Sequence, residues 1–221
     1  MKKIAAMLAC VMTVGLLGGC GNSFDASAYL KAVLDNSYKN DSTGFVELEV
    51  GTAEESAEVY QEGLTEIVDS YLYGLDATDE QKAAFEETFA EILAGAKYTV
   101  GEAEKQDDGS YVVTVTYEQM NLYVPAIAIY EEDTEALMTE WTEAAAAGEE
   151  VPSNEEMMTQ LVDLLKVSLD EAYANVTYNE AATTTVKVEI VDEYWTPSAA
   201  DLETLGGLLF DADAASQALA E

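Results

Sequence analysis

The sequence predicts an α+β fold, in which helices pack on one face of a small antiparallel sheet of about four strands. Along the chain, hydrophobic residues first recur at the 3.6-residue spacing of helices and then alternate as in strands, and this change occurs twice. Hydrophobic residues make up 49% of the 221 residues, which is enough for a packed core. The two passages from helices to a hairpin could be degenerate halves of a duplication.

The first half begins with three predicted helices. Asp25 is placed to cap a helix that continues to about Tyr38. The segments 52–55 and 78–81 are capping boxes, in which a Thr hydroxyl and a Glu or Gln side chain each bond a free backbone N–H of the other residue. Apolar residues at helical spacing follow both boxes, and Gly95 is expected to end the third helix.

A strand pair follows these helices. Tyr98 opens the first strand, Asp108-Gly109 is a typical hairpin turn, and residues 111–117 form the return strand. The next segment, residues 122–130, is apolar without a clear period, and Pro125 argues against a central strand there.

The second half repeats this order. We expect a helix from about Thr134 to Ala147 that stops at Gly148, and a third capping box at residues 153–156 starts the next helix. Residues 176–178 and 183–191 are expected strands, and Pro197 is expected at the start of a last helix. Since no Pro- or Gly-rich linker divides the halves, residues 24–221 are predicted to form a single domain.

The first twenty residues are typical of an export signal. Lys2 and Lys3 precede an apolar run over residues 4–17, which is short for a membrane span of about 20 residues. The run ends in Leu17-Gly18-Gly19-Cys20, and this resembles the lipobox of bacterial lipoproteins. The alternative is an ordinary secreted protein that is cleaved elsewhere and keeps a free cysteine.

The lipobox resemblance implies that residues 1–19 are a signal peptide and that Cys20 is the lipidated residue, with residues 20–23 as a short tether. Acyl chains such as palmitate would then hold the protein at the extracytoplasmic face of the cell membrane. Cys10 would leave with the leader, so no thiol would remain for a disulfide or a metal.

The mature chain also resembles small uncharacterised lipoproteins of Gram-positive bacteria, known only as a domain of unknown function. The resemblance rests on residues 20–23, on the helix start at residues 24–30 and on the hairpin at residues 105–111. It implies a cell-surface location, and it brings no known activity or catalytic residues.

Composition excludes several kinds of function. The chain has no His and no Arg, so it lacks an imidazole base, a Ser-His nucleophile and a guanidinium clamp for phosphate. Its net charge of −35 would repel nucleic acid. We therefore expect a non-enzymatic binding domain without a cofactor, monomeric because of its charge, whose ligand is an unknown protein, peptide or glycan.

Aromatic side chains are the candidate ligand contacts. Tyr123 and Tyr130 flank the Pro125 segment, and Tyr194 and Trp195 close the last predicted strand. Such rings stack on sugars or anchor peptides, although aromatic residues at strand ends more often belong to the core.

The many acidic residues leave two alternatives open. One is a carboxylate-dependent glycan hydrolase, but adjacent acidic pairs are no more frequent than this composition predicts. The other is a calcium-dependent surface scaffold or adhesion module, because calcium needs only oxygen ligands. Asp211 and Asp213 have the spacing of a calcium loop, but the required glycine does not follow, and Asp107-Asp108-Gly109 fits a turn better. We therefore predict no metal site from the sequence.

Overall fold

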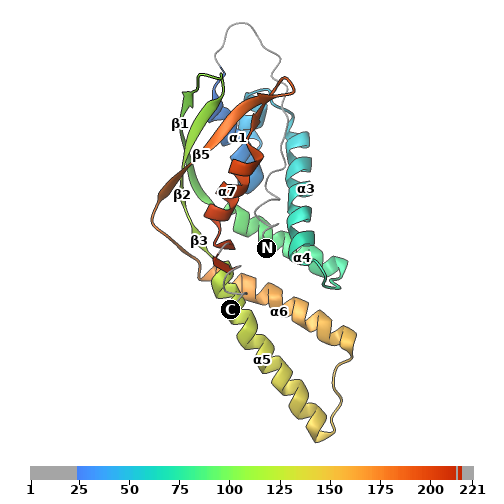
Figure 1. Ribbon diagram of the computed structural model, residues 1–221. Coiled ribbons are helices and arrows are strands. Elements are labelled where there is room, and N and C mark those ends of the chain that lie inside the picture. The colour runs from blue at the N-terminus through green and yellow to red at the C-terminus, as the bar shows by residue number, and fades with distance from the viewer. Residues whose placement is uncertain (1–23, 213, 216–221) are drawn as a thin grey trace.

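A computed structural model describes residues 24–212, 214 and 215. The described chain has an α+β fold, with seven helices and two antiparallel sheets of four and two strands. Helices lie on one side of the larger sheet, and a pair of helices projects beyond the body of the molecule (Figure 1). The predicted fold class is therefore confirmed.

The larger sheet has the strand order β1-β2-β5-β6, and all neighbouring strands are antiparallel. Its strands are β1 (Lys97–Lys105), β2 (Tyr111–Glu118), β5 (Ala182–Val191) and β6 (Tyr194–Pro197). One face is hydrophobic and fully buried, through Val113, Val115, Val186 and Val188. Thr114 and Thr185 alternate with these valines and are exposed, so the other face is open to solvent.

Two helices pack directly on the buried face of the sheet. They are α1 (Ala26–Lys39), which contacts β1 and β2, and α7 (Ala199–Leu209), which contacts β2 and β5. Behind α1 lie α2 (Thr43–Glu47), α3 (Ala53–Tyr71) and α4 (Asp79–Ala94). The predicted cap at Asp25 and the capping boxes of α3 and α4 are all present. The short helix α2 was not predicted.

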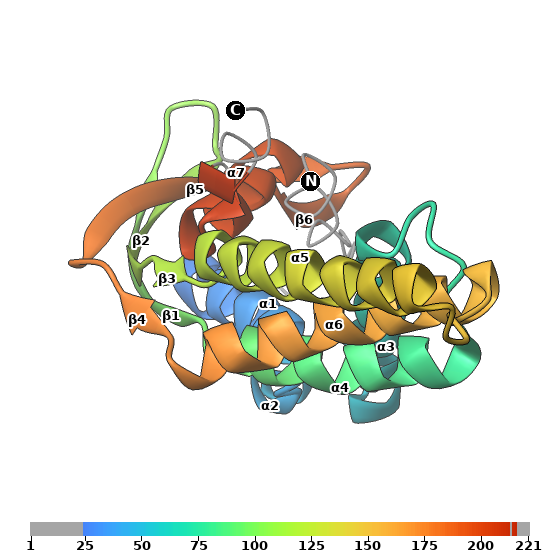
Figure 2. The ribbon, with the colours of Figure 1, turned by 90° about the horizontal axis from the view of Figure 1, so that it is seen from below.

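The projecting pair consists of α5 (Tyr123–Ala147) and α6 (Asn154–Ala174). The predicted glycine stop at Gly148 is present, with a φ of 74°, and so is the capping box at Ser153 and Glu156. Helix α6 lies between α4 and α5 (Figure 2). Side chains of α4 hold it there: Gln81 Nε2 donates to Asp163 at 2.7 Å, and Thr88 Oγ1 donates to Asp170 at 2.8 Å.

The prediction that a helix starts near Thr134 is wrong, because α5 begins eleven residues earlier, at Tyr123. Its first turn is capped by Asp211, whose carboxylate accepts from the backbone N–H groups of Leu122 (3.0 Å), Tyr123 (2.7 Å) and Val124 (3.1 Å). Pro125 comes next and has no N–H to satisfy. The apolar segment without a clear period is therefore the start of a long helix.

The strand assignments of the second half also need correction. Residues 177–178 form β4 (Thr177–Tyr178), which pairs with β3 (Met120–Asn121) in the separate two-stranded sheet. The fourth strand of the larger sheet is β6, which contains Pro197 opposite Val188. Proline is tolerated there because β6 is an edge strand. Helix α7 therefore starts at Ala199, with Ser198 as its cap, and not at Pro197.

The buried hydrophobic residues form one continuous core, which extends from Ala26 to Ala215. Among residues 24–212, 214 and 215, no helix combines the length and the hydropathy that a membrane crossing requires. The predicted signal peptide and Cys20 lie outside the described residues.

Candidate functional site

An aromatic cluster holds the first described residue of the chain. The rings of Phe24 and Trp195 are stacked, with centroids 4.1 Å apart and planes 2° from parallel. Tyr111 meets both rings edge-on, at 5.7 Å from Phe24 and 5.4 Å from Trp195. Tyr29 donates its hydroxyl to the Trp195 carbonyl oxygen at 2.8 Å. The N-terminal end of the domain is thus fixed against β2 and β6.

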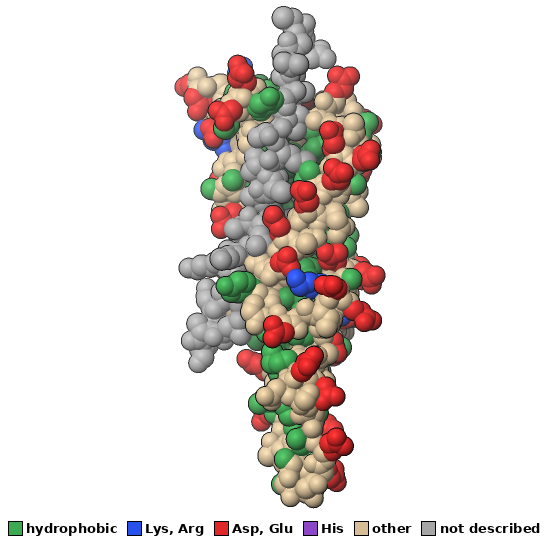
Figure 3. Space-filling view, turned by 90° about the vertical axis from the view of Figure 1, so that its right-hand side faces the viewer, with side chains coloured by type: hydrophobic (Ala, Val, Ile, Leu, Met, Phe, Trp, Pro, Cys, Tyr) green, Lys and Arg blue, Asp and Glu red, His purple; other side chains and the backbone are tan. Residues whose placement is uncertain are grey.

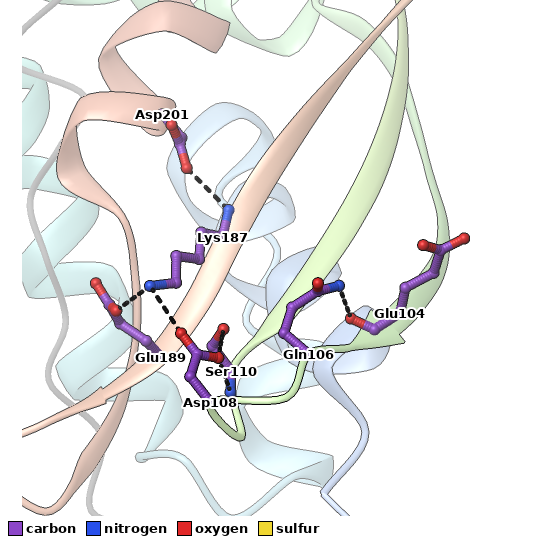
Figure 4. A network of polar contacts seen from close by, with 7 residues as sticks. All are labelled: Glu104, Gln106, Asp108, Ser110, Lys187, Glu189 and Asp201. Atoms are coloured by element: carbon purple, nitrogen blue, oxygen red, sulfur yellow. Dashed lines mark hydrogen bonds and ion pairs between the residues drawn. The ribbon is translucent and has the colours of Figure 1, made fainter.

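Polar contacts fix the neighbouring β1–β2 turn, as Figure 4 shows. Asp108 accepts from Ser110, from its N–H at 3.0 Å and its Oγ at 2.6 Å, and these hydrogen bonds lower the pKa of Asp108. Lys187 of β5 lies 2.6 Å from Glu189 and 3.7 Å from Asp108, and the hydrogen bond to Glu189 is the main reason why its pKa is raised. The turn is therefore tied to the middle of the sheet.

A junction at the end of β6 completes this network. The Lys187 N–H donates to Asp201 at 2.9 Å, and the Lys187 carbonyl oxygen accepts from the Ser198 N–H at 2.7 Å (Figure 4 shows the first contact). Because β6 ends at Pro197, the start of α7 satisfies the backbone groups of β5 that a longer strand would have paired.

The aromatic cluster and the helical hairpin lie at opposite ends of the molecule. Tyr111 directly follows the β1–β2 turn, and Figure 1 shows this turn at one end of the sheet and the α5–α6 connection at the far end of the projecting pair. Phe24, the first described residue, therefore lies at the end of the described fold opposite the tip of the hairpin.

A groove of about 640 Å³ runs along α5. Tyr130, Thr134, Met138 and Thr142 line it at intervals of four residues, so they follow one side of the helix. The other described lining residues are Thr139 and three acids, Glu131, Glu135 and Glu143, so all the described lining belongs to α5. Met138 is 56% exposed, and no lysine is among the described lining residues. The groove thus combines a row of two hydrophobic side chains, Tyr130 and Met138, and two threonines with a negative rim.

The groove also contains a polar atom without a partner. The Thr134 Oγ1 is buried and makes no hydrogen bond within the described part of the chain. Two other threonines of α5 bond backbone carbonyl oxygens one turn earlier, Thr139 to Glu135 and Thr142 to Met138, both at 2.8 Å. A buried hydroxyl without a partner is costly, so a turn of this side chain towards a ligand group in the groove would supply the hydrogen bond that the free protein lacks.

The structure does not bring the four predicted contact residues into one site. Tyr130 lines the groove, whereas Tyr123 is buried in the core, where desolvation raises its pKa. Trp195 is occupied by Phe24, and Tyr194 is 41% exposed beside the exposed Ile190 and Val191 at the end of the β5–β6 hairpin. Thr134 and Met138 were missed, although their spacing from Tyr130 would have indicated them had the start of α5 been known.

The acidic residues that suggested calcium have other roles where they are described. Asp108 stabilises a turn, as predicted, and Asp211 caps α5, while Asp213 lies outside the described residues. Within the described chain, no three side chains of His, Cys, Asp or Glu come together as a metal site.

A second, smaller hollow of about 340 Å³ includes Lys39 and Lys97. Each ammonium group already has partners: Lys39 lies 3.6 Å from Asp35 and over the Tyr98 ring, and Lys97 lies 3.2 Å from Glu118 and over the Tyr178 ring. These contacts neutralise both lysines within the fold.

The arrangement defines an α+β domain with a fixed N-terminal end and a projecting helical hairpin. No protein-family model and no curated protein matches the chain. Among solved structures, it is similar to the crystal structure of YcdA, a predicted lipoprotein of Bacillus subtilis, with a TM-score of 0.54 and 16% identity. The match covers 84% of this chain and 56% of YcdA, so the chain spans little more than half the length of that protein. At this identity the likeness shows a shared fold.

Proposed function

We propose that the protein is a lipid-anchored, extracytoplasmic binding domain that is held at the membrane through Cys20 and is not an enzyme. The observation that carries the proposal is the position of Phe24, which is stacked on Trp195 at the end of the molecule opposite the helical hairpin. An anchor placed shortly before Phe24 holds that end at the membrane.

The tether is short. Three residues separate Cys20 from Phe24, so the lipidated residue reaches at most about 14 Å from the aromatic cluster. Removal of Lys2 and Lys3 with the leader changes the net charge from −35 to −37, which opposes adhesion to an anionic bilayer. Screening confines that repulsion to about 8 Å at physiological salt. The domain therefore stands off the membrane, with the α5–α6 hairpin directed outward.

Two further observations support the proposal. YcdA, which shares the fold, is itself described as a predicted lipoprotein. The chain has no His or Arg, and acylation of Cys20 would leave the mature chain no free thiol with which to build the common catalytic sets, whereas its α5 groove presents Tyr130 and Met138 as hydrophobic contacts.

Metabolic labelling with a palmitate analogue in a bacterial host tests the anchor. The full-length protein is expected to incorporate the label and to fractionate with membranes, and Cys20→Ala should abolish both. The matched control is Cys10→Ala, which removes the other cysteine from within the leader and should change neither. Secretion of an unlabelled soluble protein by wild type would contradict the proposal.

A further inference from the structure

We propose that the groove along α5 is a docking surface for a basic amphipathic helix of a partner protein. The inference rests on the proposed binding function and gives its ligand a chemistry. It follows from the shape of the groove, from its charge and from the unpartnered Thr134 hydroxyl.

The shape of the groove fits a helix. Tyr130, Thr134, Met138 and Thr142 are spaced by about one turn each, so they line the groove in a row of about 18 Å along α5. Among the described elements α6 is the main packing partner of α5, and the half-buried Leu137 and Trp141 lie outside the groove. No other described element packs closely along this side of α5, and an amphipathic helix that lies along it would bury its own apolar side chains.

The charge of the groove selects a basic partner. Helix α5 has six acidic residues and no lysine, and Glu131, Glu135 and Glu143 line the groove itself. Figure 3 shows acidic side chains over much of one face of the molecule, including the projecting hairpin. A second copy of this chain would bring carboxylates against carboxylates, which costs binding energy. Lysine or arginine side chains beside an apolar stripe complement both features.

The Thr134 hydroxyl is the third observation. Its oxygen is buried without a partner in the described chain, at a position that lines the groove. If the Thr134 side chain turns towards the groove, an ammonium or guanidinium group of the docked helix would donate to its oxygen, and the bound state would then remove a cost that the free protein bears.

A synthetic peptide serves as the probe. It is a fluorescent helix of about five turns with leucines on one face and lysines on the other, titrated into the soluble chain from residue 21 onward, which contains the whole described core. Fluorescence anisotropy should show saturable binding with one peptide per protein. A peptide of the same composition in shuffled order, which has the same charge and no apolar face, should bind about tenfold more weakly or not at all.

Matched variants separate the groove from the overall charge. Glu135→Lys and Glu140→Lys change the net charge equally on the same helix, but only Glu135 lines the groove. Met138→Glu and Val167→Glu likewise alter two exposed apolar residues, on α5 and α6. Glu135→Lys and Met138→Glu should weaken binding about tenfold, and each control less than about twofold. All four positions are exposed, so melting curves should confirm an intact fold.

Three results would overturn the inference: absence of saturable binding, equal binding of the shuffled peptide, or equal losses for Glu135→Lys and Glu140→Lys. The titration is independent of the anchor, because the soluble chain lacks Cys20. Loss of acylation with intact peptide binding would therefore refute the proposed location alone, and the converse result would refute the docking surface alone.

Discussion

Asp211 lies 89 residues after Leu122 in the sequence, yet its carboxylate accepts hydrogen bonds from three consecutive N–H groups at the start of α5. Its own N–H donates to the Met120 carbonyl oxygen at 3.2 Å. Only 4% of Asp211 is exposed, so water cannot replace these contacts. This one side chain therefore joins the end of the chain to the base of the projecting hairpin, with a negative charge at the positive end of a helix.

We expect Asp211→Ala to lower the free energy of unfolding by about 2–3 kcal/mol, because it leaves three buried or half-buried N–H groups without an acceptor. Denaturant unfolding measures this loss. Glu54→Ala is the control, since Glu54 lies in the first turn of α3 and is exposed, and the effect there should stay within about 0.5 kcal/mol. Similar losses of stability at both positions would show that Asp211 stabilises the start of α5 no more than an exposed acidic residue stabilises the start of α3.

Because Tyr29 and Tyr38 are buried, we expect the folded state to lose stability in alkaline solution. Burial raises the pKa of Tyr29 to about 12, and it raises the pKa of Tyr38 further. In the unfolded chain a tyrosine ionises near pH 10, so the folded state favours the neutral phenol. The stabilisation is complete below pH 10 and is lost as the pH rises through about 12.

Denaturant unfolding across this pH range should show the decline, together with a late rise of tyrosinate absorbance. Tyr29→Phe should make the decline shallower, although it also removes the hydrogen bond to Trp195 and thus some stability at neutral pH. An equally steep decline in this variant would contradict the assignment.

At the scale of elements, the sequence predicted the features that depend on neighbouring residues and missed those that depend on contacts between residues far apart in the chain. All three capping boxes and the Asp108-Gly109 turn are present, because residues close in sequence make their contacts. The start of α5 was wrong because its cap comes from Asp211, and the role of Pro197 was wrong because its position depends on pairing with Val188. The groove was missed for the same reason. Tyr130 lines it only because α5 already begins at Tyr123, and the contact with Asp211 that sets this start is distant in the sequence.

The β5–β6 turn offers a test of local backbone strain. Asp192 and Glu193 both have positive φ, at 50° and 73°, as in the tight turns that favour Asn and Gly. We expect Glu193→Gly to raise the free energy of unfolding by about 0.5–1 kcal/mol, because a side chain disfavours this conformation. Gly109→Ala, at a φ of 87° in the β1–β2 turn, should have the opposite sign. Thermal and denaturant melts of both variants check the pair.

At the scale of the whole molecule, charge dominates behaviour in solution. Nine lysines oppose 44 acidic residues, and few of those acids have a lysine partner within the described chain. Such self-repulsion lowers the stability of the folded state and is weakened by salt.

We therefore expect the melting temperature to rise by the same amount in calcium, magnesium and sodium chlorides at matched ionic strength. Differential scanning calorimetry of the soluble chain measures it. A saturable rise with calcium alone would mean that a cation binds specifically to the folded state, and the calcium-dependent scaffold would then replace the present account.

The orientation at the membrane is the central claim, and energy transfer from a single-cysteine probe to labelled lipids tests it most directly. With Cys20 acylated no other thiol remains in the mature chain, so Asp107→Cys in the β1–β2 turn and Glu149→Cys after α5 can each be labelled alone. We predict strong transfer at position 107 and weak transfer at position 149. Equal transfer, or stronger transfer at position 149, would contradict an anchor that directs the α5–α6 hairpin away from the bilayer.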